Sequence, residues 1–250
     1  MKWYFIDSGF CTGKYNMEFD ISLAEKCNSE SAFFRIYRWQ PYCISLGANQ
    51  SFDDIDSFKT NADGIEVVKR PTGGRAILHA EEITYSVVYP INYDYSPKEL
   101  YQKISSALIN GLALYKPILR EAVLENIQPN FSKLLEEPSG ALCFASTAKN
   151  EVKFKGRKLI GSAQRKMKKV ILQHGSILCG SYHQNLANYL NTDDDTKNNM
   201  HNELKITTTE IESILSEPVN YEILKRCLAE GFSEYWDIHF DSQIPNITLT

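Results

Sequence analysis

Two side chains in the middle of the chain have the chemistry of an acyl-transfer site. Cys143 follows a turn at Ser139 and Gly140, which predicts a thiol in a loop, where catalytic residues are commonly presented by a rigid scaffold. Lys158 lies in a later segment, 152–160, in which apolar and charged residues alternate. A nearby cation lowers the pKa of a thiol, and a thioester divides one acyl transfer into two easier steps. The same residues are also consistent with a buried core thiol and a solvated lysine, so both interpretations stay open.

A second candidate site lies in the stretch from Lys69 to Ser86, around a Thr-Gly-Gly-Arg turn. Adjacent glycines permit positive φ angles and a close approach of the backbone to a ligand, because no Cβ stands in the way. The pattern is also typical of a tight hairpin turn with a surface arginine, and short motifs of this kind are not specific on their own. The candidate binding residues in this stretch are Arg70, Thr72, Gly73, Gly74, Arg75 and His79.

Small residues also follow Lys158 and allow a further close approach of the backbone to a ligand. Beyond them, a His-Gly pair separates two runs typical of strands, 170–172 and 176–178, which predicts a turn between them. That histidine is as consistent with a structural role as with binding, and the same holds for His79. The candidates in this region are Gly161, Ser162, Ala163, His174 and Gly175.

Positive charge is concentrated just after the candidate nucleophile. Residues 149–169 contain nine cations and one anion, Glu151, although the whole chain has a net charge of −4. Such a segment is typical of a solvated hairpin face, and equally of a docking surface for an acidic partner protein or a phosphate-bearing group. If it docks an acidic carrier domain, we expect charge reversal at Arg165, Lys166 and Lys168 to weaken that docking.

The elements that must position these residues are a mixture of strands and helices. Apolar spacing predicts a helix over 17–27, and another begins after Ser96, which forms a capping box with Glu99. A further helical segment is expected at about 183–240. Strands and helices that do not alternate regularly indicate an α+β fold, a mixed or antiparallel sheet with flanking helices. Strands are predicted at 2–7, 33–39, 43–46, 65–68, 83–89 and 152–160.

The bulk composition is that of an ordinary globular chain. Its 250 residues are 43% hydrophobic and 23% charged, which is enough for one domain with a substantial core over residues 1–250. We find no apolar run long enough to span a membrane and no signal peptide, so a cytoplasmic protein without membrane attachment is expected. The negative net charge argues against a nucleic-acid partner. The six cysteines and five histidines show no metal-ligand spacing, so no metal site is expected.

Taken together, these motifs resemble the biotin/lipoate ligase and octanoyltransferase superfamily, and within it the octanoyltransferases that carry their cysteine in a loop. The resemblance covers most of residues 2–190, with the motifs in the expected order. It implies a biotin/lipoate protein ligase-like catalytic domain. The motifs are Asn16 and Met17 with Asp20, Arg38–Pro41 with Ser45–Gly47, Thr72–Ala76 with His79 and Thr84–Ser86, Cys143 and Phe144, Lys158, Gly161–Gln164, and His174–Ser176.

That resemblance implies an acyltransferase of lipoate biosynthesis that uses neither ATP nor a cofactor of its own. Octanoyl arrives as a thioester on the phosphopantetheine arm of acyl carrier protein, and Cys143 takes it, with Lys158 activating the thiol and stabilising the oxyanion. A lysine of a lipoyl-carrier domain then accepts it as an amide; the glycine cleavage H protein and the E2 subunit of a 2-oxoacid dehydrogenase are examples. Residues 73–75 are expected to line the acyl tunnel, with His79 beneath them.

Three other functions stay open. An ATP-dependent lipoate–protein ligase would share the lysine and the Gly-Gly loop. However, Arg75 stands where ligases usually carry a third glycine. The sequence His-Ala-Glu at 79–81 also differs from the His-Asp pair of the ligase pattern. The chain also lacks room for the usual accessory domain, although split ligases exist. An amidotransferase that moves octanoyl between lipoyl domains is barely separated by this sequence. A non-enzymatic binding protein on the same fold leaves Cys143 and Lys158 without a role.

Overall fold

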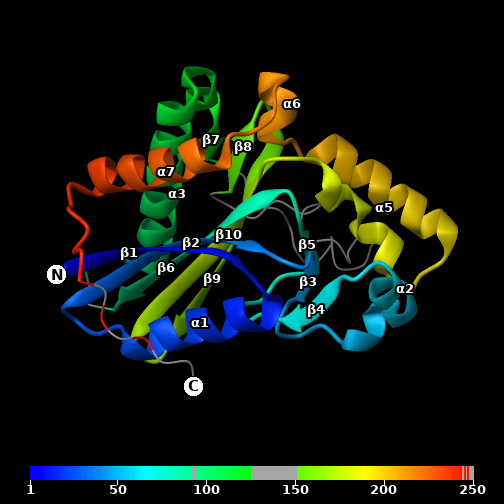
Figure 1. Cartoon of the computed structure of the whole chain (residues 1–250), viewed down its shortest axis with the longest axis horizontal. Coiled ribbons are helices and arrows are strands. Elements are labelled where there is room, and N and C mark those ends of the chain that lie inside the picture. Colours follow the sequence, from blue (N-terminus) through cyan, green and yellow to red (C-terminus); the bar gives the residue numbers. More distant parts are fainter. Residues whose placement is uncertain (92–93, 125–150, 244, 246, 248–250) are drawn as a thin grey trace.

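The structure, a computed structural model, describes residues 1–91, 94–124, 151–243, 245 and 247. Within these residues, the main element is a seven-stranded mixed sheet in the order β1-β2-β6-β10-β9-β8-β7 (Figure 1). Strands β1 and β2 are parallel, whereas every other neighbouring pair is antiparallel. The strands are β1 (Lys2–Cys11), β2 (Ser31–Trp39), β6 (Glu82–Pro90), β7 (Val123–Leu124), β8 (Val152–Phe154), β9 (Arg157–Met167) and β10 (Val170–Leu178).

The two faces of the large sheet are covered by different helices. On one face, α3 (Pro97–Tyr115) and α7 (Tyr221–Trp236) close the largest apolar core, which contains Phe34. On the other face, α1 (Gly13–Lys26) packs over Phe33. Neighbouring residues of β2 enter different cores because successive side chains of a strand point to opposite faces. The face under α1 is the one that carries the polar candidates described below.

A smaller sheet stands beside the large one and holds the Gly-Gly loop between two of its strands. In it, β3 (Cys43–Leu46) is parallel to β4 (Glu66–Lys69) and antiparallel to β5 (Ile77–His79). Its apolar residues pack against η4 (Tyr182–Tyr189) and α5 (Asp194–Thr207). The remaining short elements are η1 (Phe52–Asp54), α2 (Ser57–Ala62), η2 (Pro117–Glu121) and α6 (Ile211–Leu215).

The predicted α+β class is confirmed, and so is the start of α3. Ser96 accepts a hydrogen bond from the Glu99 amide while the Glu99 carboxylate accepts one from the Ser96 amide, which is the predicted capping box. The predicted turn between 170–172 and 176–178 is wrong. There β10 runs unbroken, with each residue paired to β6, and the hairpin turn lies at Lys168 instead.

Helix α5 lies within the helical segment expected at about 183–240, but its own bounds were not predicted because its apolar signal is weak. Within it, only Met200 and Leu204 are buried. The acidic residues before them, interpreted from the sequence as a polar run, form the helix N-terminus. Asp193 is the N-cap and accepts a hydrogen bond from the Thr196 amide at 2.8 Å. A helix that rests on the molecule through two side chains gives little periodicity to detect.

Candidate functional site

A pocket in the described part of the chain gathers most of the candidate residues. It lies between α1, the strands of the large sheet and the Gly-Gly loop. Cross-strand pairing explains the convergence, because Ser176 on β10 faces both Gly161 on β9 and Thr84 on β6. The predicted residues that line it are Arg70, His79, Lys158, Gly161, Ser162, Ala163, His174 and Gly175. The other lining residues are Met17, Tyr37, Trp39, Ser45, Ile77, Thr84, Glu151 and Ser176.

Lys158 is a buried side chain of the pocket wall. Only 1% of its side chain is exposed, and its Nζ lies 2.9 Å from Oε2 of Glu151, which is also buried. Breaking a buried ion pair by removing one partner typically costs about 3–5 kcal/mol, because the other charge is left uncompensated. The interpretation of Lys158 as a solvated strand residue is therefore wrong. Glu151 holds the amine in the pocket.

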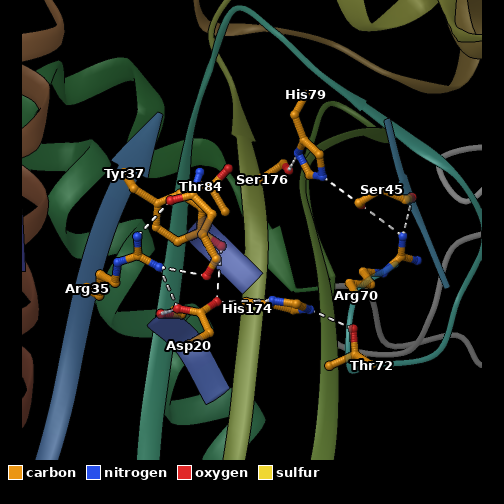
Figure 2. A network of polar contacts seen from close by, with 12 residues as sticks. Asp20, Arg35, Tyr37, Ser45, Arg70, Thr72, His79, Thr84, His174 and Ser176 are labelled. Carbon is orange, nitrogen blue, oxygen red and sulfur yellow. Dashed lines mark hydrogen bonds and ion pairs between the residues drawn. The ribbon is translucent and has the colours of Figure 1, made fainter. Parts of the chain in front are cut away.

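His79 is fixed from three sides. Figure 2 shows its contact with Ser45. In that contact Nε2 lies 2.7 Å from Oγ of Ser45, and Nδ1 lies 2.8 Å from Oε1 of Glu82. The imidazole stacks on Trp39 with ring centroids 4.0 Å apart and planes 12° from parallel. These contacts, with a further one from Oγ of Ser176 to Nδ1 at 3.3 Å, leave the ring a single orientation. His79 therefore presents an edge and not a mobile side chain to the pocket.

The buried carboxylate of Glu82 contacts His79 and two hydroxyl side chains, those of Thr84 and Ser176. Burial by itself raises the pKa of its carboxyl, but the charge of His79 and hydrogen bonds from His79, Thr84 and Ser176 hold that pKa below its usual value. All of these contacts reach Oε1. The second oxygen, Oε2, is buried without a hydrogen-bond partner among the described residues.

A second buried carboxylate, Asp20, comes from α1. Arg35 Nη1 lies 2.8 Å from its Oδ1, and the hydroxyls of Tyr37 and Ser86 donate hydrogen bonds to it at 3.1 and 2.7 Å (Figure 2). Burial by itself raises the pKa of Asp20, but the charge of Arg35, with further hydrogen bonds, holds that pKa below its usual value. Asp20 is thus an ionised group with a permanent counter-charge.

His174 connects Asp20 to the Gly-Gly loop. Its Nδ1 lies 3.5 Å from Oδ2 of Asp20, and its Nε2 lies 2.6 Å from Oγ1 of Thr72 (Figure 2). Burial lowers the pKa of His174, and the nearby Asp20 only partly offsets this effect. The imidazole is therefore neutral near pH 7. Thr72 supports the pocket through this histidine and does not line it.

The Gly-Gly loop is built around the buried guanidinium of Arg70. Its Nη2 donates hydrogen bonds to the carbonyls of Gly73 at 3.1 Å and Arg75 at 2.6 Å. Gly74 has φ +94°, which favours glycine. A Cβ on Gly47 would lie only 1.9 Å from the Gly74 carbonyl oxygen, so these two loops touch through their backbones.

The structure does not place Gly73, Gly74 and Arg75 in the pocket wall, where they were expected. Both glycines are exposed, and none of the three is among the described residues that line the pocket. The carbonyls of Gly73 and Arg75 turn inward to Arg70 instead. Gly74 is therefore required by its positive φ, whereas a Cβ on Gly73 would meet nothing within 4 Å, so the loop does not require a glycine there.

Gly175 is explained by the packing of neighbouring strands. A Cβ at this position would lie 2.4 Å from the Gly161 carbonyl oxygen and 2.9 Å from the Tyr85 ring. Beside it, the Tyr85 hydroxyl lies 2.7 Å from Oγ of Ser162, and burial raises the pKa of Tyr85 to about 12. The small residues of β9 and β10 thus admit a tyrosine between the strands, and only part of their role concerns the pocket.

Cys143, the predicted nucleophile, lies outside the described residues, as does Phe144. The described cysteines offer a contrast, because burial raises the pKa of every one of them and none lines the pocket. Thiols of this kind stay protonated and react poorly. These residues are Cys11, Cys27, Cys43, Cys179 and Cys227.

Three carboxylates at or beside the pocket were not predicted as catalytic or binding residues, although Asp20 belongs to a motif of the family resemblance and two of the three carried a signal. Asp20 lies one helical turn from Met17 and Ala24, on the apolar face of α1, where a carboxylate is rarely buried without a partner. Glu151 is the single anion of the basic segment. Glu82 precedes an apolar strand and has no comparable signal.

The described residues contain neither a group of metal ligands nor a membrane-spanning helix. No group of three or more potential metal ligands is found among the residues that the structure describes. In the same residues, no helix has both the length and the apolar character needed to cross a membrane. The absence of a metal site stays an expectation from the sequence.

Known proteins with similar sequences define the family. Residues 12–233 match the model of the lipoyl protein ligase A/B catalytic domain. The octanoyltransferase LipM of Lysinibacillus sphaericus (strain C3-41) is 32% identical over 240 residues, which cover 93% of this chain and 86% of that protein. The octanoyltransferase LipM of Bacillus subtilis (strain 168) is 30% identical over 248 residues, 96% of this chain and 88% of that one. The chain therefore belongs to the lipoyl protein ligase A/B catalytic domain family.

Solved structures with low sequence identity share the fold. A bi-partite lipoate protein ligase from Thermoplasma acidophilum superposes with a TM-score of 0.77 at 17% identity, over 97% of this chain and 87% of that chain. A lipoate-protein ligase A bound with ATP superposes with a TM-score of 0.74 at 18% identity, over 97% and 89%. The predicted biotin/lipoate ligase-like fold is confirmed.

Proposed function

We propose that this chain moves an octanoyl group from acyl carrier protein to a lysine of a lipoyl-carrier domain, through a thioester on Cys143 and without ATP. The general activity rests on its family and relatives: the chain is an octanoyltransferase of lipoate biosynthesis. The observation that supports the finer proposal is the buried pair of Lys158 and Glu151 at 2.9 Å. It holds an amine at the wall of a pocket whose other walls are largely apolar.

In the first half of the reaction, the Cys143 thiolate attacks the carbonyl carbon of the octanoyl thioester. A new carbon–sulfur bond forms, the bond to the pantetheine sulfur breaks, and that sulfur leaves as a thiolate that takes up a proton. In this proposal, the charge of Lys158 favours the Cys143 thiolate and stabilises the oxyanion of the tetrahedral intermediate. Glu151 acts on this step only through the position of the lysine.

In the second half, the neutral ε-amine of the acceptor lysine attacks the Cys143 thioester. The amide bond forms, the cysteine leaves as the thiolate, and the proton of the amine is released. Burial around the pocket limits competition by water, which would hydrolyse the thioester. The acyl chain lies along the apolar lining between β2 and α1, which includes Met17, Tyr37 and Trp39. Neither half requires a nucleotide or a resident cofactor.

Intact-mass spectrometry tests this proposal directly. Incubation with octanoyl-acyl carrier protein and no nucleotide should give one hydroxylamine-sensitive octanoyl adduct, which Cys143→Ala abolishes and Cys11→Ala retains. The variant Lys158→Met should slow formation of the adduct by about 10²–10³-fold, the usual loss when an oxyanion-stabilising group is removed. Its thermal unfolding must show that it is folded, because Lys158 is buried.

Other outcomes point to the alternatives. Lipoylation that requires ATP, with no cysteine adduct, would identify a lipoate–protein ligase. Rapid transfer from an octanoylated lipoyl domain, with slow transfer from acyl carrier protein, would identify an amidotransferase. An adduct that persists in Cys143→Ala would remove the assigned nucleophile.

A further inference from the structure

The basic segment of the sequence is divided between the two ends of β9. Lys155 and Arg157 lie at the turn before this strand, whereas Lys166 and Lys168 lie at the turn after it. The strand has 11 residues, so at about 3.3 Å per residue roughly 35 Å separate the two turns. Lys158 is buried near one end. The single strip expected from the sequence is therefore two separate surfaces.

The turn between β9 and β10 forms a groove with the last turns of α1. Figure 1 shows α1 passing beside this end of β9. The wall from α1 contributes the apolar side chains of Ala24 and Cys27 and, within the described lining, one anion, Glu25. The floor contains the half-buried Met167, which packs against the core under α1. The opposite wall has four exposed cations, Arg165, Lys166, Lys168 and Lys169.

The groove is joined to the pocket along β9. Ala163 lines the pocket, and Arg165, two residues further on, lines the groove. Arg165 also donates a hydrogen bond to the carbonyl of Pro71, and the next residue, Thr72, holds the pocket histidine His174. From Ala163 to Lys166 the strand rises by about 10 Å. A molecule seated in the groove is thus a short distance from the pocket wall.

We propose that this groove docks the acyl donor, a carrier domain with an acidic face. The proposal rests on the proposed function, because it names the surface that receives the donor. Four cations around one anion complement a negatively charged face, and on a chain with net charge −4 they orient an incoming partner towards this end of the sheet.

The distance to the pocket favours the donor over the acceptor. An acceptor lysine reaches only about 6 Å beyond its own backbone, the length of its four-carbon stem. The groove begins at Arg165, two residues or roughly 7 Å of strand beyond Ala163, and its cations extend to Lys169, so a domain seated on them lies farther from the pocket than that reach. A phosphopantetheine arm has many more bonds in its chain and spans this distance. The acceptor domain must therefore bind closer to the pocket than this groove.

A pair of matched charge reversals tests the assignment. The groove variant is Lys166→Glu with Lys168→Glu, and the control is Lys155→Glu with Arg157→Glu at the far end of β9. The two variants change the net charge equally, and each alters one residue with positive φ, Lys168 at 31° and Lys155 at 48°. Arg165 is left unchanged because it contacts the Gly-Gly loop.

We expect the KM for octanoyl-acyl carrier protein to rise about tenfold or more in the groove variant and less than twofold in the control, because like charges at an interface repel the wrong partner. Added salt should raise the wild-type KM towards that of the groove variant. Octanoyl-pantetheine, which lacks the carrier protein, should acylate wild type and groove variant at equal rates.

The outcomes separate this proposal from the proposed function. A cysteine adduct from both donors, with an unchanged carrier-protein KM in the groove variant, would overturn the docking site alone. Equal impairment of the control, or an effect confined to the KM for the lipoyl-domain acceptor, would overturn it as well. No adduct from either donor in the wild type would overturn the function, and direct binding of the carrier protein in both variants would still test the groove.

Discussion

Two carboxylate–histidine groups support the same face of the sheet, and their charges are balanced in different ways. Asp20 has a permanent counter-ion in Arg35, 2.8 Å away, and its contact with His174 is long at 3.5 Å. Glu82 makes its charged contact with His79, at 2.8 Å, and one of its oxygens is buried without a hydrogen-bond partner in the described residues. The charge of Asp20 is neutralised by Arg35, whereas the charge of Glu82 is stabilised mainly by its contact with His79.

Both groups contact residues of the pocket, since Asp20 contacts Tyr37 and His174, and they differ in how the charge of the carboxylate is balanced. Because Arg35 neutralises Asp20, His174 can stay neutral and serve as a hydrogen-bonding link to Thr72. Glu82 gathers His79, Thr84 and Ser176 on a single oxygen. All three of these residues line the pocket, so a change in Glu82 reaches the pocket directly.

The largest effect is expected from breaking the Asp20 group. The variant Asp20→Asn leaves the buried Arg35 without its counter-charge, and should lower the free energy of unfolding by about 3–5 kcal/mol. The matched control is Asp7→Asn, which breaks the more exposed pair with Lys225 and should cost about 1 kcal/mol or less. Urea unfolding of both variants measures the difference, and equal losses would contradict the role assigned to Arg35.

A smaller effect is expected from Glu82→Gln. Glutamine keeps an oxygen that accepts from Thr84 and Ser176, and no permanent cation is left alone, so the loss should be about 1–3 kcal/mol. The substitution should instead alter the pocket, because His79 loses its charged partner. Unfolding and thioester formation are measured on the same sample. A loss of stability as large as that of Asp20→Asn would show that the two groups are equivalent.

The smallest effect concerns pH. Burial lowers the pKa of both His174 and His183 in the folded chain, so the unfolded chain binds protons that the fold excludes. Above the unfolded pKa of about 6.5 both histidines are neutral in either state and do not oppose folding. As pH falls below that value, the free energy of unfolding decreases by up to about 1.4 kcal/mol per pH unit for each histidine. The variant His174→Gln should reduce this slope between pH 6.5 and 5 in urea titrations. An unchanged slope would show that His174 is protonated in the fold.

Much of the site could be predicted because its motifs are local. Arg70, His79, Lys158 and His174 were chosen from sequence alone, and the structure brings all four to one pocket. The residues around the Gly-Gly turn were also recognised, but their role was not. A pair of glycines signals an unusual backbone, and only the structure shows that Gly74 alone has a positive φ and that its carbonyl packs against Gly47.

The partners of the charged residues could not be predicted, because they come from distant segments. Asp20 meets Arg35 from a neighbouring strand, and the contact depends on which face of β2 carries the arginine. Similarly, the turn expected at Gly175 followed from its residue types. In the structure the glycine serves a continuous strand instead, because Tyr85 of β6 occupies the space of a side chain.

The family, the helix cap at Ser96 and eight of the residues that line the pocket could be recognised from the sequence alone, since each depends on residue types and short spacings along the chain. Only the tertiary structure decided that the basic segment is two surfaces and that Lys158 within it is buried against Glu151. Strand pairing joins residues that are distant in the sequence. Neighbouring cations of one segment can therefore be buried or exposed, depending on the strands that lie beside each of them.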